Sequence, residues 1–223
     1  MKRMGMRSGL FAVLLVVLPV ESAAQGLADY DYENLSLRGI GVDWGYIWPN
    51  KADATSMYSM RVDLGFLGPA IRIVPGVHYW SSSMKRSEVD RVAERLSNLP
   101  ALQASGVIID ADDLGNIEWK AVSMTIDAQA VWTAPYRIFT FIGLGAGLHA
   151  MNGSGSSIED TFIEDLLDTI TPGVAVMAGL EYEPTPSLRL YTEGRYTVQS
   201  EVSYPGIRVG AALMIPNRAG GAQ

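Results

Sequence analysis

The chain has 223 residues, no cysteine, two histidines and a formal net charge of −7 at pH 7. The lack of cysteine excludes disulfide scaffolds, thiol enzymes, Cys-ligated metal sites and a lipid anchor on an N-terminal cysteine. Two histidines are too few for a three-His metal site. The acidic balance also excludes the positive surface that a nucleic-acid-binding protein needs. We therefore expect neither a cofactor nor a nucleic-acid partner.

Residues 1–24 predict a cleaved export signal. Three basic residues precede an apolar run at 10–20, and small residues follow at 22–24, where we expect cleavage. A membrane anchor is the alternative, but a spanning helix needs about 20 apolar residues. Pro19 and Glu21 end this run early. The export signal is therefore the favoured interpretation.

Eight runs of alternating apolar and polar residues follow the export signal. Each has the period of two that indicates a β-strand, and an even number of antiparallel strands can close without a free edge. The runs are residues 35–48, 57–67, 70–80, 117–132, 138–151, 173–182, 188–197 and 206–215.

The connections between these runs alternate in length. Short, proline-containing turns lie at 68–69, 133–136 and 184–186. Short turns on one rim and longer loops on the other are typical of an up-and-down outer-membrane barrel, whose termini lie on the short-turn side. The longer connections are residues 49–56, 81–116, 152–172 and 198–205.

One register of the eight runs holds no charged residue, and its aromatic side chains lie near the ends of the runs. This distribution predicts two girdles at the membrane interfaces. From Tyr58 to Phe66 the strand would rise roughly 23 Å, close to the apolar band of about 25 Å. We expect Trp44, Tyr46, Trp48, Tyr58, Tyr79 and Tyr196 in the girdle near the longer loops, and Phe66, Trp132 and Tyr182 in the other.

The opposite register carries glycines together with equal numbers of arginines and acids. A soluble ligand-carrying barrel would enclose its apolar register instead, but small residues suit the crowded interior of an eight-stranded barrel. We therefore expect the charges to face the lumen. They would either form a salt-bridged plug, which we favour because the signs cancel, or line a narrow ion path. These residues are Arg61, Arg72, Arg189, Arg195, Arg208, Asp43, Asp63, Asp127, Glu181 and Glu193.

The export signal, the alternating strands, the short turns and the charge-lined, glycine-rich interior resemble the small OmpA/OmpX-like outer-membrane β-barrels over residues 35–215. The resemblance implies an all-β, eight-stranded antiparallel transmembrane barrel at 35–216, surrounded by the lipid of a bacterial outer membrane. We expect it to be monomeric. A periplasmic segment at 25–34 would precede it, and a polar tail at 217–223 would follow. Family members usually have an aromatic residue at the end of the last strand, where this chain has Ile215.

The expected function is structural or surface-interacting, and a lipid-modifying enzyme is an alternative. His78 lies close in sequence to Ser81, Ser82 and Ser83, and hydrolysis by serine needs a histidine base. However, the register directs His78 into the lumen, and its spacing to Ser81 differs from the His-x-Ser arrangement of lipid A deacylases. We therefore expect no catalysis. His149 is predicted to form hydrogen bonds in the lumen or at its rim.

Two of the longer loops are predicted to contain short helices. Ser87 and Asp90 have the spacing of a capping box, as do Ser157 and Asp160, and each pair accompanies an amphipathic stretch. We expect the apolar faces of these helices to cover the barrel mouth, although they could bind an extracellular partner. Residues 110–116 superficially resemble an EF-hand loop, but the later ligand positions do not fit. A solvated acidic loop is the favoured interpretation.

Overall fold

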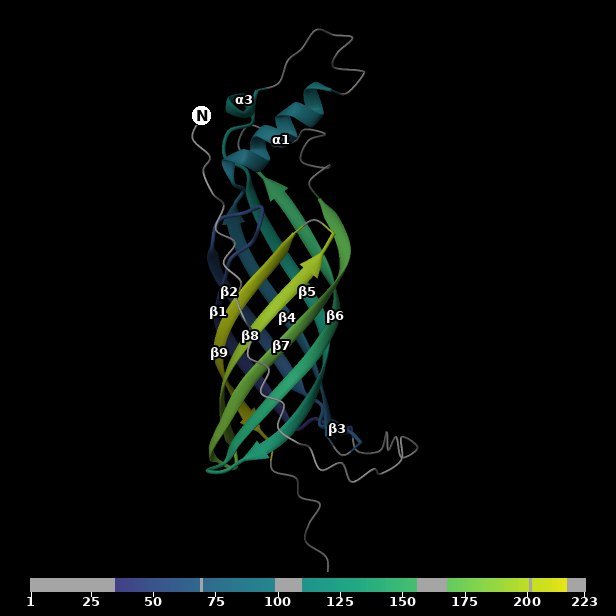
Figure 1. Ribbon diagram of the computed structural model, residues 1–223, viewed down its shortest axis with the longest axis vertical. Coiled ribbons are helices and arrows are strands. Elements are labelled where there is room, and N and C mark those ends of the chain that lie inside the picture. The colour runs from purple at the N-terminus through teal and green to yellow at the C-terminus, as the bar shows by residue number, and fades with distance from the viewer. Residues whose placement is uncertain (1–34, 69, 99–109, 156–167, 201, 216–223) are drawn as a thin grey trace, which may run out of the picture.

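In the computed structural model, the chain forms a closed antiparallel β-barrel (Figure 1). The structure describes residues 35–68, 70–98, 110–155, 168–200 and 202–215. The predicted export signal, the segment 25–34, the second loop helix near Ser157 and the polar tail lie outside the described residues.

Eight long strands make the barrel wall. Each long strand pairs with the next one along the chain, and β1 also pairs with β9, so the wall has no free edge. This arrangement confirms the predicted eight-stranded, up-and-down fold. The long strands are β1 (Gly39–Ile47), β2 (Thr55–Asp63), β4 (Ile71–Ser83), β5 (Glu118–Ala134), β6 (Ile138–Ser154), β7 (Thr169–Thr185), β8 (Leu188–Gln199) and β9 (Ser203–Met214).

The second predicted run is broken into two strands. After β2 ends, a two-residue strand, β3 (Phe66–Leu67), pairs with the start of β4. Arg61 pairs with Gly76 and Phe66 with Arg72, so the first side of the ladder holds one residue more than the second. Gly65 lies in this bulge with a φ of 80°, a backbone conformation that favours glycine. Alternation of polarity carries no information on such a break.

The two ends of the barrel carry different connections. Gly39 pairs with Met214, so the first and last residues of the wall lie side by side at the end with the short turns. We call this the short-turn end and the opposite one the long-loop end. Two helices, α1 (Arg86–Ser97) and α3 (Ala111–Leu114), lie beyond the long-loop end, at the top of Figure 1. No helix among the described residues is long and apolar enough to span a membrane.

The capping box predicted at Ser87 is wrong. Helix α1 begins at Arg86 with Lys85 as its N-cap, and no side chain caps it. Lys85 instead donates from Nζ to the backbone oxygen atoms of Pro49 and Asn50, at 2.9 and 3.0 Å. Contacts with the loop between β1 and β2 therefore hold the start of this helix. A capping box is present at α3, where Asp110 and Asp113 satisfy each other's backbone amides, so the acidic stretch at 110–116 contains a short helix.

Burial along the strands shows which register faces inward. In β1 every second residue is buried, beginning with Gly39, and the intervening residues are exposed. The charged and glycine-containing register is the buried one, and large apolar side chains such as Ile126 and Leu144 are more than 60% exposed on the outer wall. An apolar surface of this extent is far larger than a water-soluble monomer exposes.

Candidate functional site

Arg72 organises the half of the lumen near the short-turn end. Its guanidinium donates two parallel hydrogen bonds to Glu181, each 2.7 Å long. It also donates to Gln129 Oε1 from Nε and Nη2, at 3.0 and 2.6 Å. Arg61 shares the same carboxylate through a 3.0 Å bond to Glu181 Oε1. Because Arg72 and Glu181 are only 1% exposed, these charges are satisfied by each other rather than by solvent.

Asp63 and Arg189 extend this cluster to the short-turn rim. Asp63 Oδ2 lies 3.6 Å from Arg72 Nη1 and 3.7 Å from Arg189 Nη1. Arg189 Nε donates to Glu183 Oε2 at 3.1 Å. Asp63 and Arg189 are more exposed than Arg72, so their pairing stabilises the protein less than the pairs deeper in the lumen.

A second cluster of charges occupies the lumen nearer the long-loop end. Arg195 binds both oxygen atoms of Asp127, at 2.7 and 3.0 Å. Arg208 donates from Nη2 to Glu193 Oε1 at 2.6 Å, and its Nη1 lies 3.7 Å from Asp43 Oδ1. All five residues are buried. Two of the three pairs are therefore direct charge-assisted hydrogen bonds, and the third acts by charge alone.

Tyr191 joins the two clusters. Its hydroxyl donates to Asp43 Oδ2 at 2.8 Å, and the guanidinium carbon of Arg61 lies 3.2 Å from the centre of its ring. Arg61 also lies 3.8 Å from Glu193. The structure thus brings all ten charges named from the sequence into one lumen charge network, together with Gln129, Glu183 and Tyr191. The sequence reasoning selected charged residues and so missed Gln129 and Tyr191, although both lie in the same inward register.

Little space remains inside this part of the barrel. A cavity beside Arg61, Arg72 and Glu181 measures only about 10 Å³. A single water molecule needs about 10 to 15 Å³ by this kind of measure. A hydrated ion could pass only if the side chains of the network moved apart.

The long-loop end of the lumen is closed by apolar side chains. Val89, Val92, Ala93 and Leu96 of α1 are buried in one cluster with residues of the barrel wall, among them Trp80 and Tyr204. The rings of Trp80 and Tyr204 meet edge to face, with centroids 5.9 Å apart. This apolar cap, formed by α1 and the cluster beneath it, covers the barrel mouth.

An ion pair connects helix α1 of the cap to helix α3. Arg86 of α1 donates a hydrogen bond to Asp112 of α3, and this bond raises the pKa of the Arg86 guanidinium above its usual value. Because the pair is exposed, it contributes little to stability. The apolar contacts of α1 hold the cap in place instead.

The histidine and serine residues considered for catalysis do not form a pair on the outer wall. His78 is buried in the lumen, where its Nε2 lies 3.0 Å from Thr125 Oγ1 and its Nδ1 accepts from Arg208 at 3.2 Å. Ser81 Oγ donates to Glu118, and Ser82 Oγ donates to the backbone oxygen atom of Asp53. The hydrogen-bonding positions of His78 are therefore occupied by groups other than these serines.

A different serine does contact a histidine, inside the barrel. Ser123 Oγ lies 2.6 Å from His149 Nδ1, because the two residues face each other across β5 and β6. Both are almost fully buried. Neither the sequence spacing nor the predicted faces identified this pair, which needed the strand register. Its buried position separates it from the surface that a lipid substrate would approach.

The outer wall carries the nine aromatic residues named from the sequence. Trp44, Tyr58 and Tyr79 lie in one row across β1, β2 and β4. Phe66 is only partly exposed, and the Arg38 guanidinium lies over its ring at 5.6 Å. The other eight are exposed, namely Trp44, Tyr46, Trp48, Tyr58, Tyr79, Trp132, Tyr182 and Tyr196.

No protein-family model matches the chain, and no curated protein matches it in sequence. Among solved structures, Neisserial surface protein A is similar with a TM-score of 0.51 and 12% identity, over 79% of this chain and 96% of that one. Ail, the attachment invasion locus protein of Yersinia pestis, gives a TM-score of 0.48 and 11% identity, over 81% and 99%. The N-terminal β-barrel domain of Pseudomonas aeruginosa OprF gives 0.47 and 9%, over 80% and 98%. The likeness to the first structure confirms the predicted resemblance at the level of the fold.

Proposed function

We propose that the protein is a monomeric barrel of a bacterial outer membrane that conducts no solute and acts as a structural or surface-interaction protein. One observation carries this proposal. The lumen charge network joins the strands across the barrel interior, and the apolar cap lies over the long-loop end. A barrel closed in both ways presents only its outer wall and its loops to other molecules.

The geometry of the outer wall supports a position in a membrane. Tyr79 pairs with Val122 of β5, and Trp132 lies ten residues further along the same strand. At about 3.3 Å per residue and a strand tilt near 40°, the two girdles are ~25 Å apart along the membrane normal. This height matches the apolar band of outer-membrane barrels, which is about 25 Å.

The long-loop end is proposed to face the cell exterior. In outer-membrane barrels the short turns lie on the periplasmic side, together with the first and last residues of the barrel wall. The solvent-facing side of α1 then lies on the cell surface, where it presents both acidic and basic side chains, among them Asp90, Arg91 and Glu94. A mixed-charge surface suits a polar extracellular partner rather than an apolar one.

Planar lipid bilayers test the closed lumen. We expect the purified, folded protein to give no steady conductance, while a general-diffusion porin added to the same bilayers does. Resistance of the inserted barrel to an added protease shows that the silent protein is in the membrane. A steady single-channel conductance from the unaltered protein would refute the proposal and establish the ion-path alternative.

A further inference from the structure

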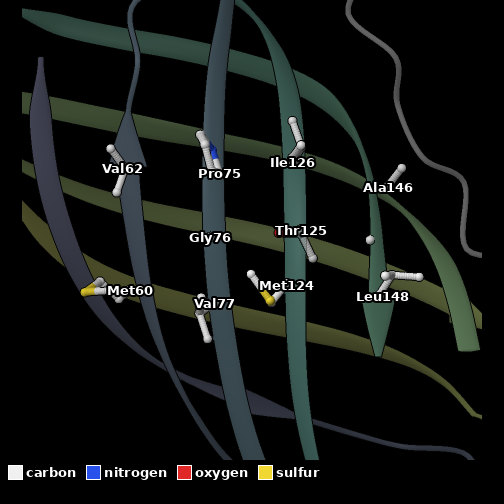
Figure 2. Close-up of a pocket in the computed structure, with 11 residues that line it drawn as sticks. Met60, Val62, Pro75, Gly76, Val77, Met124, Thr125, Ile126, Ala146 and Leu148 are labelled. Atoms are coloured by element: carbon white, nitrogen blue, oxygen red, sulfur yellow. The ribbon is translucent and has the colours of Figure 1, made fainter. Parts of the chain in front are cut away.

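A shallow hollow of about 450 Å³ lies in the outer wall across β2, β4, β5 and β6 (Figure 2). Met60, Val77, Met124 and Leu148 form one wall of it, because they face one another in turn across the three strand pairs. The adjacent row of outward side chains, nearer the short-turn end, forms the other wall. The hollow therefore runs between two rows of side chains on the surface that faces the membrane.

Two small residues in the second row create the hollow. Pro75 and Ala146 flank Ile126 in that row, and their side chains are smaller than those of the first row. Pro75 also lacks a backbone N–H, and the regular pairing of β2 with β4 ends beside it, at Arg61 and Gly76. The hollow is thus part of the wall itself and sits at the break between β2 and β3.

The lining of the hollow suits a hydrocarbon chain. Its side chains are almost entirely apolar, and the two methionines can adapt to an irregular flexible guest. Its volume lies within the range of about 300 to 1,000 Å³ that is usual for sites binding small molecules. Among molecules that reach this surface in a bilayer, a lipid acyl chain has the matching shape and polarity.

Lys120 marks where the polar end of such a lipid would lie. Among the described strands, it is the only positively charged residue in the outward register, and its side chain forms no hydrogen bond or ion pair with another described residue. It is four residues from Met124 along β5, about 13 Å toward the long-loop end. It also lies two residues beyond Val122, the partner of Tyr79, and so just outside the aromatic girdle at the level of lipid headgroups.

We propose that this face of the barrel binds a phosphate-bearing membrane lipid, with an acyl chain in the hollow and the phosphate at Lys120. The site rests on the membrane placement proposed above and belongs to the leaflet on the long-loop side. The nearest outward acid on β5, Glu118, accepts a hydrogen bond from Ser81. The site adds lipid selectivity to a barrel whose interior is closed.

The two methionines of the hollow provide the probe. We would label methionine methyl groups with ¹³C in the micelle-embedded barrel and titrate it with short-chain phosphatidic acid or with phosphatidylcholine of the same chains. We expect phosphatidic acid to shift the signals of Met60 and Met124 and to bind more tightly than phosphatidylcholine. Lys120→Gln should weaken phosphatidic acid binding about five-fold, which corresponds to about 1 kcal/mol per basic side chain at a membrane surface. Arg95→Gln, which removes an exposed charge on α1, should leave it unchanged.

A second pair of variants tests the hollow. Ala146→Phe should fill it and abolish the methionine shifts, whereas Ala178→Phe, on the outward face of β7, should not. Equal binding of the two lipids, or unchanged binding in Lys120→Gln, would overturn the proposal. Shifts that follow inorganic phosphate alone, or protein concentration rather than lipid, would assign the surface to a free anion or a second barrel and overturn it too. Protease resistance of the barrel in vesicles reports the membrane placement separately.

Discussion

Replacing Gly210 by alanine should destabilise the barrel, because the lumen has no room for a methyl group there. A Cβ atom at Gly210 would lie 2.5 Å from Tyr191 Cζ, 2.5 Å from the backbone oxygen atom of Val42 and 2.6 Å from Asp43 Cβ. Tyr191 is fixed by its hydrogen bond to Asp43 and by the Arg61 guanidinium over its ring. Relief of the clash would therefore have to move the backbone of β1 or break part of the lumen charge network.

The magnitude follows from comparison with a second glycine. Overpacking a buried site costs about 1 to 3 kcal/mol. Alanine in place of glycine also restricts the unfolded chain, which stabilises the folded state by about 0.4 to 1 kcal/mol where the backbone tolerates it. Gly194 faces outward, and the nearest atom to a Cβ there is the backbone oxygen atom of Ala178 at 4.0 Å. Gly194→Ala should show only this stabilisation, without the cost of overpacking. The unfolding free energies of the two variants should therefore differ by about 1 to 3 kcal/mol.

Urea unfolding in one detergent, followed by tryptophan fluorescence, measures this difference. We expect the unfolding midpoint of Gly210→Ala to lie clearly below that of Gly194→Ala, with similar slopes for the two transitions. Coincident midpoints would refute the close packing of Tyr191 and Asp43 against β9.

Three further predictions concern the lipid face, the lumen and the topology. Ile126→Arg should cost about 2 to 4 kcal/mol in the unfolding free energy measured in liposomes, since Ile126 faces outward, and equal stability would contradict the assigned register. Arg195→Met should cost about 3 to 5 kcal/mol because it removes both hydrogen bonds to the buried Asp127 and leaves it only Arg208, 4.0 Å away, and adding Asp127→Leu should recover part of the loss in a double-mutant cycle. Since the chain has no cysteine, Glu94→Cys on α1 should react with a membrane-impermeant maleimide on intact cells, whereas Ser187→Cys at the short-turn end should react only after permeabilisation, and the reverse result would invert the orientation.

The barrel wall could be predicted because a strand has a period of two. When one face contacts lipid and the other a crowded polar interior, every second residue must be apolar, and this pattern needs no knowledge of the fold. The strand limits were predicted less well. β6 continues to Ser154 and β7 begins at Thr169, beyond the apolar alternation. Backbone hydrogen bonds extend these strands beyond the membrane, where the outward side chains no longer need to be apolar.

The partners within the lumen could not be predicted. Gln129 faces Arg72 on the neighbouring strand, and the register alone would identify that contact. Glu181, however, reaches Arg72 and Arg61 across the lumen from β7, and Tyr191 reaches Asp43 between β8 and β1. Such contacts depend on the stagger of all eight strands, which the charge pattern of single strands does not encode.

The fold class alone does not determine which membrane lipid the outer wall binds. That depends on the positions where the wall departs from a regular apolar pattern. An uninterrupted outer wall of apolar side chains would be equally compatible with any membrane lipid. Pro75 interrupts the pairing of β4 with β2, and Lys120 places a charge on the outward register just beyond the girdle. Each departure alone has a structural explanation, a bulge or a residue at the headgroup level. Because they lie on the same face and at the spacing of a lipid's chain and headgroup, together they favour selective binding of one lipid class, and the lumen variants should leave that binding unchanged wherever the barrel still folds.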